Sequence, residues 1–99
     1  MVRINWTFQA KEDLKSIAEY ISRDSKRYAK LQVLRIKKKT GCLKSQTHLG
    51  KIVSEIDKEN IRELIEGRYR IIYKIISKNH IDILTIHHTA RDLPRRNIK

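Results

Sequence analysis

Two adjacent histidines, two arginines and a glutamate are the residues of this sequence best suited to chemistry. His87, His88, Arg70, Arg91 and Glu55 contain every group that metal-free cleavage of RNA requires. Such cleavage needs a base for the ribose 2′-hydroxyl, an acid for the leaving 5′-oxygen and cations for the charge that develops on the phosphate. These residues are therefore candidate catalytic residues, on the condition that the chain cuts RNA.

The histidine pair also has an ordinary structural interpretation. Neighbouring residues of a regular strand point to opposite faces of a sheet, so at most one of His87 and His88 could contribute to a catalytic site. In the structural interpretation, one histidine is half-buried and hydrogen-bonded while the other is solvated. A histidine pair alone is not a catalytic signature, and this interpretation is therefore kept beside the catalytic one.

The two arginines have competing roles as well. Arg70 lies within an apolar run, where a guanidinium must be paired or face solvent. A salt bridge to Glu63 or Glu66 on the neighbouring strand competes with contact to a phosphate. Arg91 directly follows the last predicted strand, at a sheet edge where loops often carry function. We expect Arg91 to bind a target or partner, with a surface salt bridge as the alternative.

Positive charge is concentrated in two blocks of the chain. Lys and Arg outnumber Asp and Glu by 23 to 11, which gives a formal charge of +12, and no acidic residue occurs between Asp24 and Glu55. Such blocks attract polyanions or an acidic protein, although a basic helix face can also serve solubility alone. The candidate binding residues are Lys37, Lys38 and Lys39 in the first block, and Arg91, Arg95 and Arg96 in the second.

The beginning of the chain has the pattern of a strand followed by a helix. Residues 2–6 alternate apolar and polar side chains, which predicts a short strand. Thr7 is the expected N-cap, and apolar residues then recur at helical spacing as far as residue 21. Glu12 and Asp13 are expected in the first turn, where carboxylates favour the positive end of the helix dipole.

A second helix follows closely. Asp24 and Ser25 form the next stop and cap, and an apolar stripe runs from residue 29 to residue 40. Gly41 is expected at the end of this helix, because glycine weakens a helix interior. Two helices joined by so short a connection predict an antiparallel hairpin.

The second half of the sequence predicts an antiparallel meander. Four β-prone runs, KIVSEI, IRELIE, YRIIYKII and HIDILTIHH, are separated by turns too short for a parallel crossover. YRIIYKII is bulky on both faces, as in a central strand, and Tyr69 and Tyr73 share the face expected beneath the helices, with base stacking as the alternative. The predicted fold class is α+β, in the order β-α-α-β-β-β(-β), with the antiparallel helical hairpin packed on a curled antiparallel sheet.

Other features limit the class of protein. No linker-like stretch divides residues 1–99, so one domain is expected. Cys42 is the only cysteine and the four histidines lack metal-ligand spacing, so we expect no disulfide, no metal and no cofactor. No apolar run approaches a membrane span, and the first residues lack the pattern of an export signal. The expected location is the cytoplasm.

Five strings, in this order and spacing, resemble the RelE/ParE superfamily of type II toxins over nearly the whole chain. They are Trp6-Thr7 at the end of the first strand, DLKSIAEYI (13–21), GKIVSE (50–55), RELIEGRYRIIYKI (62–75) and IDILTIHHTARDL (81–93). The resemblance implies a small cytoplasmic toxin that a partner antitoxin holds inactive.

The branch of the superfamily that the chain resembles decides whether we expect an inhibitor or an enzyme. In RNA-cleaving RelE-like members, lysines and arginines grip the substrate phosphates, and Arg70 and Arg91 match two of those arginines. The terminal aromatic residue of those members is missing, because no aromatic follows Arg91. The loop also departs from the common form, with Gln46 and Thr47 in place of a Phe-Pro pair and Ser54 in place of a proline. The strings RELI, YRIIY and HHTARDL look more like the ParE branch, whose characterised members poison DNA gyrase.

The resemblance therefore implies a gyrase inhibitor of the plasmid-stabilising kind that arrests growth when its antitoxin is absent. The first alternative is a ribosome-dependent mRNA endoribonuclease that uses Arg70, Arg91 and one of His87 and His88 without a metal. The second is a non-toxic basic module that binds nucleic acid. The implied partners are a cognate antitoxin and either gyrase or the ribosome. Operator DNA would be contacted only through the antitoxin, and no membrane partner is expected.

Overall fold

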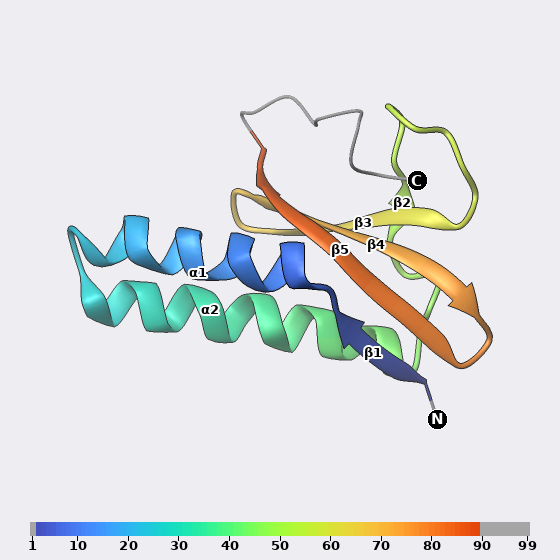
Figure 1. Ribbon diagram of the computed structural model, residues 1–99, viewed down its shortest axis with the longest axis horizontal. Coiled ribbons are helices and arrows are strands. Elements are labelled where there is room, and N and C mark those ends of the chain that lie inside the picture. The colour runs from blue at the N-terminus through green and yellow to red at the C-terminus, as the bar shows by residue number, and fades with distance from the viewer. Residues whose placement is uncertain (1, 90–99) are drawn as a thin grey trace.

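In the computed structural model, which describes residues 2–89, a hairpin of two helices packs against one face of a five-stranded sheet (Figure 1). The elements are β1 (Arg3–Trp6), α1 (Phe8–Ser22), α2 (Lys26–Gly41), the short 3-10 helix η1 (Cys42–Lys44), β2 (Lys51–Ile52), β3 (Ile61–Glu66), β4 (Tyr69–Ser77) and β5 (His80–His88). The predicted α+β class and order of elements are confirmed.

The sheet combines the predicted meander with one parallel pair. Its strand order is β1-β5-β4-β3-β2, and β2 to β5 pair antiparallel along the chain. β1 instead runs parallel to β5, from Arg3 opposite His80 to Trp6 opposite Ile83, so the sheet is mixed. The helical hairpin between β1 and the meander is long enough to permit a parallel neighbour. A strand of four residues carries no pattern that specifies the direction of its partner.

Both predicted helix caps are present. The Thr7 hydroxyl accepts a hydrogen bond from the backbone N–H of Ala10 at 3.2 Å and donates one to the Ile83 carbonyl at 2.7 Å, which ties the start of α1 to β5. The Ser25 hydroxyl accepts from the N–H of Tyr28 at 3.1 Å at the start of α2. These caps satisfy backbone donors that a helix leaves unpaired at its N-terminus.

The expectation for Glu12 and Asp13 is wrong, because α1 begins at Phe8 and has no acidic residue in its first turn. Asp13 instead binds the sheet. Its carboxylate accepts hydrogen bonds from the Thr85 hydroxyl and from the backbone N–H of Ile86, the latter at 3.0 Å. The pairing of β1 with β5 stops at Ile83, so this carboxylate supplies a partner to an edge that no strand reaches.

We expect Asp13→Ala to lower the free energy of unfolding by about 1–3 kcal/mol, because it removes the partner of the Ile86 N–H and of a buried hydroxyl. Glu12→Ala, at the exposed neighbouring position, is the matched control and should change stability by no more than about 0.5 kcal/mol. Thermal unfolding of both variants measures the difference. Equal effects would show that the contact to β5 contributes nothing.

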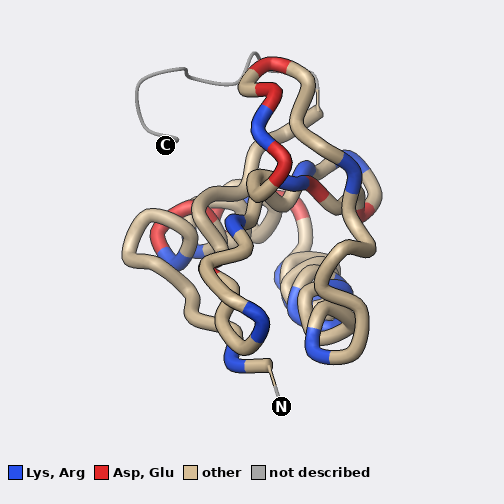
Figure 2. The backbone as a smooth tube through the Cα atoms, turned by 90° about the vertical axis from the view of Figure 1, so that its right-hand side faces the viewer, with Lys and Arg blue, Asp and Glu red and all other residues tan. Residues whose placement is uncertain are grey.

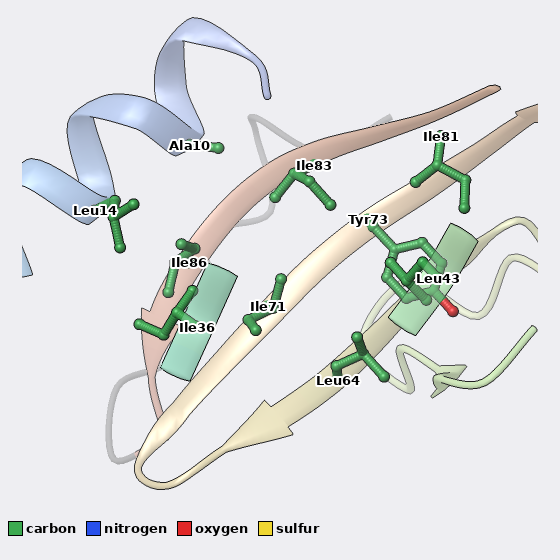
Figure 3. Close-up of a cluster of buried hydrophobic side chains, with 10 residues drawn as sticks. All are labelled: Ala10, Leu14, Ile36, Leu43, Leu64, Ile71, Tyr73, Ile81, Ile83 and Ile86. Carbon is green, nitrogen blue, oxygen red and sulfur yellow. The ribbon is translucent and has the colours of Figure 1, made fainter. Parts of the chain in front are cut away.

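The main core lies between the helices and the sheet, and Figure 3 shows helix side chains pointing at the strands. Tyr73 of β4 is fully buried there and Tyr69 packs against the same cluster, which confirms their predicted place beneath the helices. The cluster consists of Ala10, Leu14, Ile36, Leu43, Leu64, Ile71, Tyr73, Ile81, Ile83 and Ile86.

A second, smaller cluster covers part of the opposite face of the sheet. Ile72 of the central strand β4 packs there with Ile61 and with Val53, which lies just after β2. The loop after β2 therefore folds over the face away from the helices. We call this side of the sheet the open face, because the helices do not reach it.

Candidate functional site

Arg70 is held on the open face by two carboxylates. Its Nη1 and Nη2 donate to both oxygens of Glu55, at 2.7 and 3.0 Å, and its Nε donates to Glu63 at 3.0 Å. Nη2 also forms an ion pair with Glu63. Lys51 lies 3.9 Å from the other Glu63 oxygen, so the group contains two cations and two carboxylates. We call these four residues the Arg70 cluster.

Three parts of the chain bring the cluster together. Arg70 of β4 is opposite Ile65 of β3, which places Glu63, two residues earlier on β3, diagonally across on the same face. Glu66 is opposite Tyr69 and lies on the other face, so of the two predicted partners the structure selects Glu63. Glu55 comes from the loop over the open face and was not anticipated as a partner. It is fifteen residues from Arg70, and no local pattern signals the contact.

The ionisation of the cluster follows from these contacts. The hydrogen bonds from Arg70 hold the pKa of Glu55 at about 2, below its ordinary value of 4.5. Contacts with Glu55 first, and with Glu63, raise the pKa of Arg70 against the opposing effect of burial. The side chains of Arg70 and Glu63 are only 12% and 5% exposed, whereas that of Glu55 is 37% exposed. Glu55 and Arg70 are therefore both ionised at neutral pH.

Glu55 should make stability depend on pH in acid. Its pKa in the folded chain lies below its ordinary value, so its contribution is complete above about pH 4.5 and is lost as the pH falls toward about 2. We expect Glu55→Gln to be less stable than the wild type at neutral pH, with the difference vanishing in acid. Urea unfolding at several pH values across this range measures the difference in the free energy of unfolding between Glu55→Gln and the wild type. Glu59→Gln, in the same loop, is the control. A difference between Glu55→Gln and the wild type that stays constant with pH would contradict the lowered pKa of Glu55.

The two histidines occupy different positions, as the strand pattern predicts. His87 is opposite Arg70 in the pairing of β4 with β5, which brings it to the open face beside the Arg70 cluster. His88 is opposite Tyr69, and the two rings meet edge to face with centroids 5.5 Å apart. Of the predicted catalytic residues within residues 2–89, Arg70 and His87 are therefore partners on adjacent strands, whereas His87 and His88 both line a cleft beside α1.

The predicted binding lysines lie on α2 and do not share one environment. Lys37 and Lys38 are exposed, whereas Lys39 is half-buried. All charged residues of this helix are basic, and they follow one another along its turns (Figure 2): Lys26, Arg27, Lys30, Arg35, Lys37, Lys38 and Lys39. The remaining predicted binding residues, Arg91, Arg95 and Arg96, lie outside the described residues.

Two further observations concern the described part of the chain. Within residues 2–89, no three His, Cys, Asp or Glu side chains lie where they could share a metal ion. Neither helix there has the length and apolar character needed to cross a membrane.

A helical hairpin on a mixed sheet, in this order of elements, is the RelE/ParE toxin fold. The chain belongs to the ParE toxin family, because residues 4–93 match the family described as the ParE toxin of the type II toxin-antitoxin system parDE. No curated protein matches the sequence.

Two solved structures with this fold are similar to the chain. One is described as the chromosomal ParDE toxin-antitoxin system from P. aeruginosa, with 22% identity, a TM-score of 0.72 and coverage of 89% of this chain and 96% of that one. The other is the YoeB-YefM complex from Staphylococcus aureus, with 21% identity, a TM-score of 0.55 and coverage of 89% and 97%. At these identities the likeness concerns the fold.

Proposed function

We propose that this toxin inhibits DNA gyrase by occupying it, without cutting RNA, and that a cognate antitoxin neutralises it. The observation that carries the proposal is the double pairing of Arg70. A catalytic arginine for RNA cleavage must meet the charge that develops on the phosphate. Both ends of this guanidinium already face carboxylates, which would repel a phosphate brought to the same place.

The state of the possible acids and bases supports the same choice. A general acid must carry a proton near the working pH, and Glu55, with a pKa of about 2, does not. His87 is the strand partner of Arg70 and a candidate base, but the sequence has no aromatic residue after Arg91 to complete the RelE-like pattern. Inhibition by binding needs none of these groups. The open face therefore supports a structural role for Arg70 more than a catalytic one.

The proposed antitoxin is supported by charge and by the similar structures. The chain has a formal charge of +12, which favours an acidic partner. Of the two solved structures described above, one is described as a toxin-antitoxin system and the other as a complex of two proteins. In this proposal operator DNA is contacted only through the antitoxin, the toxin acts in the cytoplasm, and Arg91, Arg95, Arg96 and the α2 lysines contact the target or partner.

Two assays with the purified chain test the target. We expect the protein to inhibit DNA supercoiling by gyrase, and its cognate antitoxin to relieve that inhibition. In parallel, messenger RNA on ribosomes should stay intact. Cuts in ribosome-bound messenger that disappear in His87→Ala would overturn the proposal in favour of the endoribonuclease. Active gyrase together with intact messenger would exclude both targets.

A further inference from the structure

We propose that the outer side of α2 binds the phosphate backbone of duplex DNA without regard to base sequence. This goes beyond the proposed function, because it gives the cations of α2 a ligand of stated chemistry and holds whichever protein is the target. Phosphate contacts carry no sequence information, so such binding differs from the recognition of an operator. The outer side is the exposed strip of α2 opposite its buried residues, and it consists of Arg27, Lys30, Leu31, Leu34, Arg35 and Lys38.

The packing of α2 leaves this strip in solvent along the whole helix. The buried residues of α2 recur three or four positions apart and are Ala29, Gln32, Ile36 and Thr40. This spacing turns a single side of the helix toward the rest of the molecule. In the view of Figure 1, α2 runs along the lower edge of the molecule. The 16 residues of the helix rise about 24 Å, so the strip is long as well as exposed.

The strip carries positive charge that the described chain does not neutralise. Arg27, Lys30, Arg35 and Lys38 are all exposed. α2 contains no acidic residue, and none of its cations takes part in an ion pair within residues 2–89. Lys37 stands apart from these four, because it lines a groove between the two helices and β1. The outer side therefore attracts a polyanion.

Duplex DNA matches the length and the shape of the strip. Each strand carries a phosphate about every 3.4 Å, so a stretch as long as α2 presents about seven phosphates per strand. A helix with its side chains is about 10–12 Å across, which fits the major groove, about 12 Å wide. Lys30 and Arg35 lie on opposite flanks of the strip, about 140° apart around the helix. They can therefore approach the phosphates that border the groove on its two sides.

The two leucines of the strip do not favour an apolar partner in place of DNA. Leu34 is 63% exposed, and Lys30 and Lys38 lie one helical turn before and after it. Leu31 is placed in the same way between two arginines. A protein or a bilayer that buried these leucines would also remove the neighbouring cations from water, which is costly. A duplex meets the cations and leaves the leucines at the surface.

A titration of the purified chain into a short fluorescent duplex tests the proposal. Anisotropy measures binding at several salt concentrations. We expect the logarithm of the affinity to fall with the logarithm of the salt concentration at a slope of about −3 to −4, because each of four phosphate contacts releases about 0.9 counterions. Polyglutamate is the control polyanion. It should compete at least about tenfold more weakly than unlabelled duplex at equal charge, because its charges are less dense than those of DNA.

Two double variants with the same loss of charge locate the binding surface. Lys30→Gln with Lys38→Gln changes the outer side of α2, whereas Lys58→Gln with Lys78→Gln changes exposed residues beside the sheet strands. We expect the first pair to weaken duplex binding about tenfold or more and to reduce the salt slope by about 2. The second pair should weaken binding by less than about threefold and keep the slope.

Leu34→Ala separates DNA from an apolar partner. Because the duplex is held by the cations, this variant should keep duplex binding within about threefold of the wild type. Four results would each overturn the proposal: equal losses in the two double variants, a salt slope near zero, polyglutamate competing as well as duplex, or a tenfold loss of duplex binding in Leu34→Ala.

Discussion

Arg70→Ala is expected to lower the free energy of unfolding by about 3–5 kcal/mol, because it leaves the nearly buried Glu63 carboxylate without its main partner. Lys51, at 3.9 Å from the other oxygen, is too distant and too exposed to compensate. Glu55 would also lose the contact that holds the loop to the open face. For a chain of this size such a loss corresponds to a decrease of at least about 10 °C in the melting temperature.

Two further variants separate the loss of pairing from a general effect of removing an arginine. Arg68→Ala, in the exposed turn before β4, removes the same type of side chain and should cost no more than about 0.5 kcal/mol. Arg70→Met combined with Glu63→Met removes the buried charges together and should recover most of the stability that Arg70→Ala loses. A double variant no more stable than Arg70→Ala would contradict this explanation.

Gly50→Ala is expected to destabilise the fold by about 3 kcal/mol or more, because there is no room for a side chain at this position. A Cβ atom on Gly50 would lie 2.4 Å from the backbone oxygen of Glu63 and 2.8 Å from Cε1 of Tyr73. Neither neighbour can yield, since one is the backbone of a sheet strand and the other is a fully buried ring.

The Tyr73 hydroxyl adds to this cost. It accepts a hydrogen bond from the Gly50 N–H at 2.9 Å and donates one to the Thr47 carbonyl at 2.9 Å. A movement of the loop that relieved the clash would break these bonds. Denaturant unfolding measures the loss, and a Gly50→Ala chain within about 1 kcal/mol of the wild type would show that the loop adjusts freely.

Gly41→Ala is the matched control for the glycine prediction. Gly41 has helical backbone angles, and a Cβ atom there meets nothing within 4 Å. Alanine favours a helix over glycine, so this variant should gain about 0.5–1 kcal/mol. Opposite signs at the two glycines would identify close approach at Gly50, and not the general flexibility of glycine, as the cause.

The sequence by itself determined the local elements. Both helices start at the predicted caps, and the strands β3 to β5 coincide with the isoleucine-rich runs. The turn between β3 and β4 contains glycine where the backbone requires it, because Gly67 has a φ of +61°, a conformation that other residues rarely adopt. Periodicity, capping and turn chemistry depend on residues close together in the chain, so they can be read without knowledge of the fold.

Because some elements are joined by short turns, the sequence also indicated some of the neighbours in the site. Because the turn between β3 and β4 is short, the sequence indicated Glu63 or Glu66 as the partner of Arg70, and the structure selects Glu63. The different strand partners of His87 and His88 followed in the same way from the alternation of a strand. The binding surface predicted around Arg91, in the C-terminal basic block, lies outside the described residues and stays a prediction.

Only the tertiary structure decided the contacts between distant segments. Four features each join elements that meet only after the hairpin and sheet have packed. They are the parallel pairing of β1, the binding of Asp13 to β5, the contact of Glu55 with Arg70 and the groove around Lys37. Such contacts depend on the positions of several elements at once, and each residue involved is unremarkable in its local sequence. The same lysines that read as a uniform basic block are therefore separated by the fold into those that line a groove and those that do not.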